Sequence, residues 1–220
     1  GESIDALYNY KFTGVWQANE TAEAASFGQK EGQAKVEDYN KDGKITTADR
    51  QILGNNNPDW TGSLSTKLKV GNFDLAATAI TSQGVLAFSP FHRNFTDVND
   101  RGRQKLDIDW YVPANDAGLP TQYTNSYPQA QNPGTYWIND GVGYYKDASF
   151  VKVQNIALGY TFTPQVIEKL KLKYLRLYVN VLNPFVFTKY DGYDPEWASA
   201  SFGVGRVASI TYQLGMSIKF

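Results

Sequence analysis

The last thirteen residues of the chain carry the feature that most limits its fold. In residues 208–220 every even position is apolar, while the odd positions hold Ser, Thr, Gln, Gly or Lys. Successive side chains of a β-strand point to opposite faces, so this segment predicts a strand with one wholly apolar face. Strands of soluble proteins usually run to about five or six residues. A strand this long indicates a sheet whose two faces meet different environments along its full height.

Five further segments alternate in the same way, so the sequence predicts about six strands. They are residues 7–16, 62–70, 73–86, 150–162 and 174–183. The segment 150–162 changes phase, because Val151 and Val153 stand at odd positions whereas Ile156 and Leu158 stand at even ones. A β-bulge between them would restore a single apolar face.

The connections between these strands differ in length in a regular order. Long connections at 17–59, about 87–148 and 184–205 alternate with short ones at 71–72 and 163–171. The pair Gly71-Asn72 is a hairpin signal, and Thr163-Pro164 predicts one short helical turn. Short turns at one end and long loops at the other are typical of outer-membrane barrels. With the chain end in the periplasm, all three long connections would lie outside the cell.

The composition excludes several classes of protein. With 21 basic and 22 acidic residues the net charge is -1, which gives no reason to expect nucleic acid as a partner. Cysteine is absent and His92 is the only histidine, so thiolate chemistry and histidine-rich metal sites are excluded. We expect His92 in a solvated loop and no enzymatic activity. No apolar run reaches 18 residues, which excludes a membrane-spanning helix but not membrane-spanning strands.

The stretch "DYNKDGKITTAD" matches a calcium-binding loop of the EF-hand type. The predicted cation ligands are Asp38, Asn40, Asp42, the backbone carbonyl of Lys44, and Asp49. Gly43 stands where such a loop bends sharply. The alternative is an Asx-turn followed by a short helix capped near Thr46 or Thr47. A calcium sensor needs helices on both sides of its loop, and no amphipathic helix precedes Asp38. The expected cofactor is therefore a structural Ca²⁺ that orders a long loop.

Taken in order, several segments resemble the C-terminal part of SusC/RagA-type TonB-linked outer-membrane proteins of the Bacteroidetes. The resemblance covers nearly the whole chain. It is carried by "YNYKFTGVWQ", "DYNKDGKITTADRQILGNNNPDWTGSLSTKL", "GNFDLAATA", "DWYVPANDAGLP", "YYKDASFVKVQNIALGYTF" and "LRLYVNVLNPFVFTKYDGYDPE". The chain end is similar to the last strand of outer-membrane barrels, a signal for the barrel assembly machinery. The residues that match it are Gln213, Gly215, Ile218 and Phe220.

This resemblance implies an all-β fold, an antiparallel section of a transmembrane barrel of roughly 22 strands embedded in outer-membrane lipid. About six strands cannot close such a barrel, so we expect the plug and the other strands N-terminal to this segment in a longer parent chain. The implied function is TonB-dependent import of a glycan or peptide across the bacterial outer membrane. The implied partners are a SusD-like surface lipoprotein and the TonB complex.

Four aromatic residues of the second long connection are candidates for contact with substrate or with the lipoprotein. They are Trp110, Tyr111, Tyr136 and Trp137. Packing within the loop explains them equally well. The segment 191–197, "DGYDPEW", has the same two explanations.

One alternative from another class remains open at this point. A secreted, calcium-stabilised β-sandwich that binds carbohydrate would also combine alternating strands, aromatic residues and a cation loop.

Overall fold

The computed structural model describes residues 1–96, 106–114, 118–169, 171–200 and 208–220. The chain divides into two compact units. The loop unit comprises residues 1–57, 86–147 and 198–202, and the sheet unit comprises residues 58–85, 148–197 and 203–220. Parts of the predicted long connections, at 97–105, 115–117 and 201–207, lie outside the described residues.

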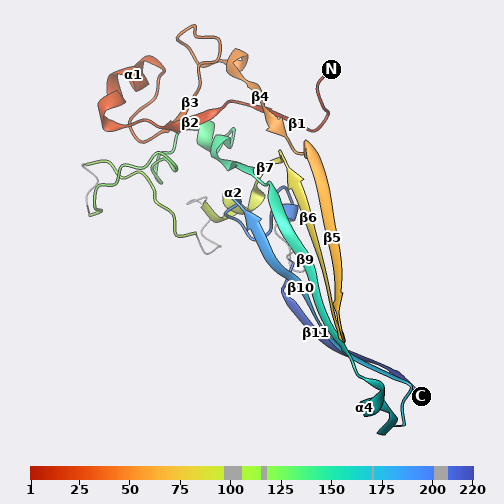
Figure 1. Ribbon diagram of the computed structural model, residues 1–220. Coiled ribbons are helices and arrows are strands. Elements are labelled where there is room, and N and C mark those ends of the chain that lie inside the picture. The colour runs from red at the N-terminus through yellow and green to blue at the C-terminus, as the bar shows by residue number, and fades with distance from the viewer. Residues whose placement is uncertain (97–105, 115–117, 170, 201–207) are drawn as a thin grey trace. The chain divides into compact units, whose positions relative to one another are not determined.

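The sheet unit is a single antiparallel sheet of five strands in the order β11-β10-β9-β6-β5 (Figure 1). Its elements are β5 (Trp60–Val70), β6 (Phe73–Gln83), β9 (Phe150–Thr161), α4 (Pro164–Lys169), β10 (Tyr174–Thr188), η4 (Pro195–Trp197) and β11 (Thr211–Lys219). Its shorter strands, β5 and β6 among them, have 9 to 12 residues and β10 has 15. Tilted strands of about 9–11 residues are sufficient to cross a bilayer.

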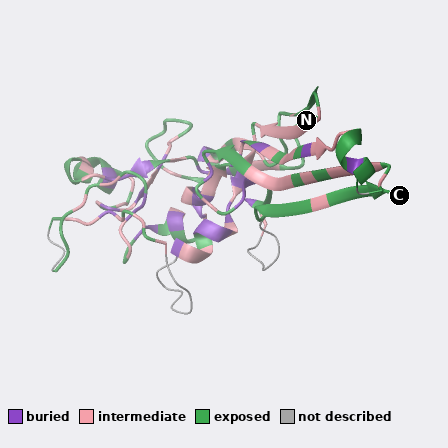
Figure 2. Cartoon of the chain, turned by 60° about the horizontal axis from the view of Figure 1, so that its bottom comes forward, coloured by how far each residue is buried: buried purple, intermediate pink, exposed green. Residues whose placement is uncertain are grey.

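One face of this sheet is apolar from edge to edge, because directly opposed residues of neighbouring strands share a face. One complete row across the five strands consists of Leu68, Leu75, Leu158, Val179 and Leu214. Leu214 is 82% exposed, and β11 is exposed along most of its length (Figure 2). The alternation in 208–220 therefore places apolar side chains on an open surface, where a sandwich would cover them with a second sheet.

The predicted bulge in 150–162 lies at Gln154. Asn155 pairs with Thr78 of β6, but the next paired residue of β9 is Val153, opposite Ala79. The skipped residue returns Val153 to the face that carries Leu158. Strand β10 also shifts its pairing in this region, at Asn183, where φ is +51°.

Both short connections lie at one end of the sheet, together with the chain end. Gly71 turns β5 into β6 with φ of +57°, a conformation that glycine adopts without strain. Helix α4 begins at Pro164, and the N–H of Ile167 donates to the carbonyl of Thr163, as the sequence predicts. The long connections leave from the opposite end of the strands. Short and long connections are therefore segregated as predicted.

The loop unit contains short elements. They are β1 (Ala6–Asn9), β2 (Phe12–Val15), η1 (Ala18–Glu20), α1 (Thr21–Ser26), β3 (Ala34–Val36), η2 (Thr47–Asp49), β4 (Gln51–Asn55), β7 (Leu86–Phe88), α2 (Pro90–Thr96), α3 (Thr135–Ile138), η3 (Val142–Tyr144) and β8 (Tyr145–Asp147). Strand pairs β1-β4, β2-β3 and β7-β8 form three small sheets.

The prediction of a continuous strand over residues 7–16 is wrong. The segment is divided into β1 and β2, which pair with different partners, so the large sheet has five strands and not six. The physical reason is that Tyr10 is buried in an aromatic core, and its neighbour Asn9 turns its amide to the carbonyl of Asp140. The alternation of Tyr8, Tyr10 and Phe12 reflects packing in this core.

The core of the loop unit is aromatic. Its buried members are Tyr10, Ala34, Val36, Tyr127, Trp137, Val142 and Tyr144. Trp137 contacts Tyr144 and Tyr127 edge to face, with ring centroids 5.1 and 5.8 Å apart. Such contacts stabilise aromatic clusters beyond the area that they bury.

The expectation that His92 is solvated is also wrong. It lies buried on α2, where its Nδ1 is 2.8 Å from the hydroxyl of Ser89. In the part of the chain that is described, no helix has the length and apolar character needed to cross a membrane.

Candidate functional site

The predicted cation loop is closed by hydrogen bonds among its own predicted ligands. One carboxylate oxygen of Asp38 accepts from the N–H of Gly43 at 2.8 Å, where φ of +79° makes the sharp bend. The amide of Asn40 donates to Asp42 at 3.0 Å, and the backbone N–H of Asn40 donates to Asp49 at 3.3 Å. These four side chains therefore already lie around one loop.

Asp49 is fully buried at the base of this loop. Its second oxygen accepts from the N–H of Thr46 at 2.7 Å, in a capping box that begins η2. Burial opposes the ionisation of Asp49, but the backbone donors of Thr46 and Asn40 outweigh it and hold the pKa of the carboxyl below its usual value. The short capped helix of the alternative reading is thus present.

The loop fits a cation in its types of ligand and in their position along the loop. Among the described residues no three acidic or histidine side chains are grouped as a metal ion would require. Asp38 is half-buried and Asp42 is exposed, and both accept backbone N–H groups of their own loop. Carboxylate, amide and carbonyl oxygens are nevertheless the ligand types that Ca²⁺ takes.

The base of the loop is tied to the aromatic core by Arg50. Its guanidinium lies 2.7 Å from Asp140 and 4.8 Å from the centroid of the Tyr10 ring. An ordered loop would therefore be fixed to the core from which the rest of the loop unit is built.

Of the four predicted contact residues, two are buried. Tyr111 is 1% exposed and its hydroxyl donates to Glu31 at 2.8 Å, while Trp137 is 4% exposed in the core. Burial, together with the hydrogen bond to Glu31, raises the pKa of Tyr111. Tyr136 packs against Tyr10 with centroids 5.1 Å apart. Packing within the loop accounts for these three. Trp110 is half-buried, like Tyr136, and also packs against the core.

A pocket of about 330 Å³ opens beside Trp110. It is lined by Ile108, Trp110, Tyr111, Val112, Leu119, Pro120, Gln122, Gln129, Ala130 and Gln131. One edge of the Trp110 side chain is held by Tyr127, with centroids 5.7 Å apart. The sequence singled out Trp110 and Tyr111, but not the glutamines that complete the pocket.

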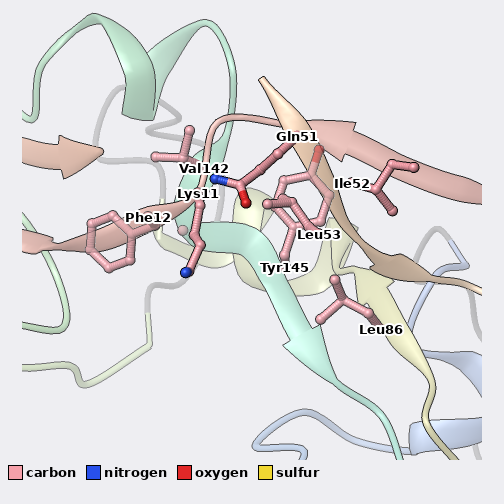
Figure 3. Close-up of a pocket in the computed structure, with 9 residues that line it drawn as sticks. Lys11, Phe12, Gln51, Ile52, Leu53, Leu86, Val142 and Tyr145 are labelled. Carbon is pink, nitrogen blue, oxygen red and sulfur yellow. The ribbon is translucent and has the colours of Figure 1, made fainter. Parts of the chain in front are cut away.

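A second pocket of about 370 Å³ in the loop unit contains none of the predicted residues. It is lined by Lys11, Phe12, Gln51, Ile52, Leu53, Leu86, Val142, Gly143 and Tyr145 (Figure 3). Glu37 already engages its two main polar groups, since its carboxylate lies 3.2 Å from Lys11 and 2.7 Å from the amide of Gln51.

The predicted assembly residues divide between the two faces of the sheet unit. Ile218 belongs to the apolar face, and Phe220 lies beyond the end of β11, largely exposed. Gln213 faces Asn180 on the polar face, and their amides are joined at 3.0 Å. Gly215 lies opposite Tyr178, whose ring occupies the space that a side chain at 215 would need.

Sequence reasoning missed the arrangement around Gly215. One row of the polar face consists of Lys69, Asp74, Gly159, Tyr178 and Gly215, which we call the glycine row. Arg176 lies on the same face of β10, two residues before Tyr178. Its guanidinium passes over Gly159 and donates to the carboxylate of Asp74 at 2.6 and 3.0 Å. Two glycines inside long strands were the available signal, because interior glycine marks a close approach.

A second feature that the sequence did not reveal is a group of ion pairs that stabilises the segment 191–197. Lys152 of β9 is buried on the polar face, paired with Glu196 and 3.9 Å from Asp194. Asp194 also accepts from the N–H of Glu196 at 3.1 Å and of Ala208 at 3.1 Å. These contacts favour the turn interpretation of this segment over ligand contact.

No protein-family model matches the chain. It is 28% identical over 201 residues to TonB-dependent receptor P3 of Formosa agariphila, an alignment that covers 89% of this chain and 19% of that receptor. It is also 28% identical over 186 residues to TonB-dependent receptor SusC of Bacteroides thetaiotaomicron, covering 83% of this chain and 17% of SusC. The chain thus spans about a fifth of the length of these relatives.

Among solved structures, the chain is similar to the RagAB peptide importer in its open-open state. The TM-score is 0.69 at 16% sequence identity, with 98% of this chain and 22% of that chain covered. The RagAB peptide transporter gives a TM-score of 0.66, also at 16% identity. The predicted resemblance to SusC/RagA-type receptors, the antiparallel barrel-section fold and the outer-membrane location are therefore confirmed.

Proposed function

We propose that this segment forms part of the wall and outer loops of a receptor that imports a nutrient across the outer membrane in a TonB-dependent manner. The observation that carries the proposal is the apolar row from Leu68 to Leu214, backed by a polar face, in a chain similar to TonB-dependent receptors. The segment acts by forming a passage and not by catalysis.

The two faces fit a wall between lipid and an aqueous interior. Aromatic side chains stand at both ends of the strands, as in the girdles of barrel proteins. Phe73 and Tyr160 are in contact at the short-turn end, with centroids 4.8 Å apart. Phe185 and Phe187 stack near the other end at 6.4 Å.

The remaining strands and the plug are proposed to belong to the same parent chain as this segment. In the described part of the sheet unit, β5 and β11 each pair on one side only. Unpaired backbone groups cost several kcal/mol each in lipid, so further strands must cover both edges. The TonB contact is assigned to the missing N-terminal part, and Gln213, Gly215, Ile218 and Phe220 to recognition by the barrel assembly machinery.

The loop unit is proposed to face the cell exterior and a SusD-like lipoprotein. The RagAB structures and SusC support this pairing by their similarity to the chain. The imported nutrient is a glycan or a peptide. We also propose that Asp38, Asn40, Asp42, the backbone carbonyl of Lys44, and Asp49 hold a structural Ca²⁺ that orders this surface. Hydrogen bonds already join the side chains of Asp38, Asn40, Asp42 and Asp49 to groups of this one loop.

The test is uptake by cells that produce the parent receptor. The receptor should fractionate with the outer membrane, and substrate accumulation should stop when TonB is deleted or the membrane potential is dissipated. Accumulation that continues without TonB would contradict the proposal. A water-soluble, monomeric product of the parent gene would instead support the carbohydrate-binding sandwich.

A further inference from the structure

We propose that the pocket beside Trp110 binds the end of an uncharged oligosaccharide, with the Trp110 ring as the stacking surface and the amides of Gln122 and Gln131 as hydrogen-bonding groups. The inference rests on the proposed import function and adds to it a site and a substrate class.

The Trp110 side chain is pre-positioned for such a role. Tyr127 belongs to the buried core and contacts the Trp110 ring edge to face, so the ring is supported from within the loop unit. The side chain nevertheless remains half-buried and lines the pocket. A rigid aromatic side chain offers a large contact area at a small cost in conformational entropy.

The polar groups of the pocket are neutral and available. None of the ten described residues that line it carries a charge. Within the described part of the chain, the side-chain amides of Gln122 and Gln131 and the indole N–H of Trp110 make no hydrogen bond. Gln129 is already used, because its amide donates to the carbonyl of Asn132 at 3.1 Å.

This combination selects for a sugar. A pyranose ring has an apolar C–H face for the indole and hydroxyl groups at its rim that both donate to and accept from amides. A charged ligand would lose its hydration against described lining residues that offer no opposite charge, which is unfavourable. Acidic glycans and charged peptide ends are thus disfavoured.

The size of the pocket limits what enters it. About 330 Å³ is near the lower end of the roughly 300–1,000 Å³ of small-molecule sites, so the pocket takes one end of a chain and not the whole polymer. The pocket beside Lys11 is less suited, because Glu37 already binds the Lys11 ammonium and the Gln51 amide that line it.

The experiment measures binding to the full-length receptor in detergent by isothermal titration. The probes are malto-, cello- and manno-oligosaccharides, an oligogalacturonate as the charged counterpart, and an alanine peptide. Trp110→Ala should weaken binding of the preferred neutral sugar on the order of tenfold or more, as expected for removal of an anchoring aromatic side chain. Trp110→Phe should retain part of the affinity.

Two further variants separate binding from folding. Gln131→Glu changes an exposed residue and should also weaken the neutral sugar, because the added charge must be desolvated when a sugar covers it. Tyr8→Ala removes an exposed aromatic side chain outside the pocket and should leave binding unchanged.

The inference is overturned if no neutral sugar binds, if Trp110→Ala and Gln131→Glu both bind like the wild type, or if the peptide or oligogalacturonate is the ligand lost in these variants. These outcomes leave TonB-dependent uptake intact. Uptake that does not need TonB would instead reject the proposed function, whatever the pocket binds.

Discussion

The glycine row makes a quantitative prediction about Gly159. An added Cβ at this position would lie less than 3.0 Å from atoms of Arg176 and Asp74, closer than real Cβ atoms approach. Gly159→Ala should therefore displace the guanidinium and break its two contacts with Asp74. The ion pair links β6 to β10 across β9, so its loss should loosen three strands at once.

The magnitude follows from the burial of the pair. The side chains of Arg176 and Asp74 are 24% and 18% exposed, between a surface pair worth about 0–1 kcal/mol and a buried pair whose disruption costs about 3–5 kcal/mol. We expect a loss of about 1–2 kcal/mol, offset by the roughly 0.5–1 kcal/mol that alanine gains over glycine in a strand. In an Arg176→Ala background the ion pair is already absent, and the Asp74 carboxylate, no longer held by the guanidinium, can turn away from the new Cβ. The coupling energy between the two sites should therefore be about 1–2 kcal/mol.

The assay is amide hydrogen exchange in the full-length receptor, which reports the free energy of local opening of β9 and β10. The four proteins of the double-mutant cycle are compared. Gly62→Ala in β5 is the matched control, because its added Cβ would meet only side-chain atoms of Thr81 and Trp60, the nearest at 3.3 Å. An equal effect of Gly159→Ala with and without Arg176 would refute the steric argument.

Three further predictions concern the cation loop and the outer end of the sheet. Asp42→Ala should abolish Ca²⁺ binding to the receptor in isothermal titration, and unchanged binding would reject the assignment of Asp38, Asn40, Asp42, Lys44 and Asp49. Because the folded-state pKa of Asp49 is lowered, its stabilising effect is complete above the ordinary carboxyl pKa of about 3.9 and is lost as the pH falls through the folded value. The protection factor of the Thr46 amide, which compares its exchange rate with that of an unstructured peptide at the same pH, should therefore stay high at neutral pH and fall below about pH 4, while Asp49→Asn should remove this pH dependence. Lys152→Met should leave Asp194 and Glu196 without their cation, so exchange in residues 191–197 should rise by an amount that corresponds to about 1–3 kcal/mol, and no change would show that the turn is held by other contacts.

The sequence predicts the sheet unit better than the loop unit, and the reason is physical. A strand between two solvents must alternate along its whole length, so residues 208–220 reveal both the strand and its apolar face. The phase change between Val153 and Ile156 predicts a bulge in this strand, and the structure places it at Gln154. Residues 7–16 alternate as well, but there Tyr10 is buried against Tyr136 within a compact core. Period two alone does not distinguish lipid from a packed aromatic core on the apolar side.

The two candidate sites differ in how far the sequence predicts them, for a related reason. The cation loop is local, and its spacing in the sequence already predicts the hydrogen bonds that join Asn40 to Asp49 and Asp38 to Gly43 within one loop. The pocket beside Trp110 is assembled by a backbone bridge between Val112 and Gln122 and by the aromatic core, so its glutamines have no signature in the sequence.

The glycine row shows that the polar face also helps to fix the register of the strands. Polar positions on neighbouring strands can pair in many ways, yet Arg176 reaches Asp74 only because the intervening residue has no side chain. Tyr178 leans over Gly215 in the same manner, and the Arg176 guanidinium lies 5.1 Å from the centroid of the Tyr178 ring. A one-residue slip of β9 or β11 would replace each glycine in this row by a residue with a Cβ and would turn the apolar side chains to the wrong face. The two glycines thus fix the register from the polar side, while the apolar row from Leu68 to Leu214 fixes it from the apolar side. This gives Gly215 a role in the folded sheet in addition to its proposed role in assembly.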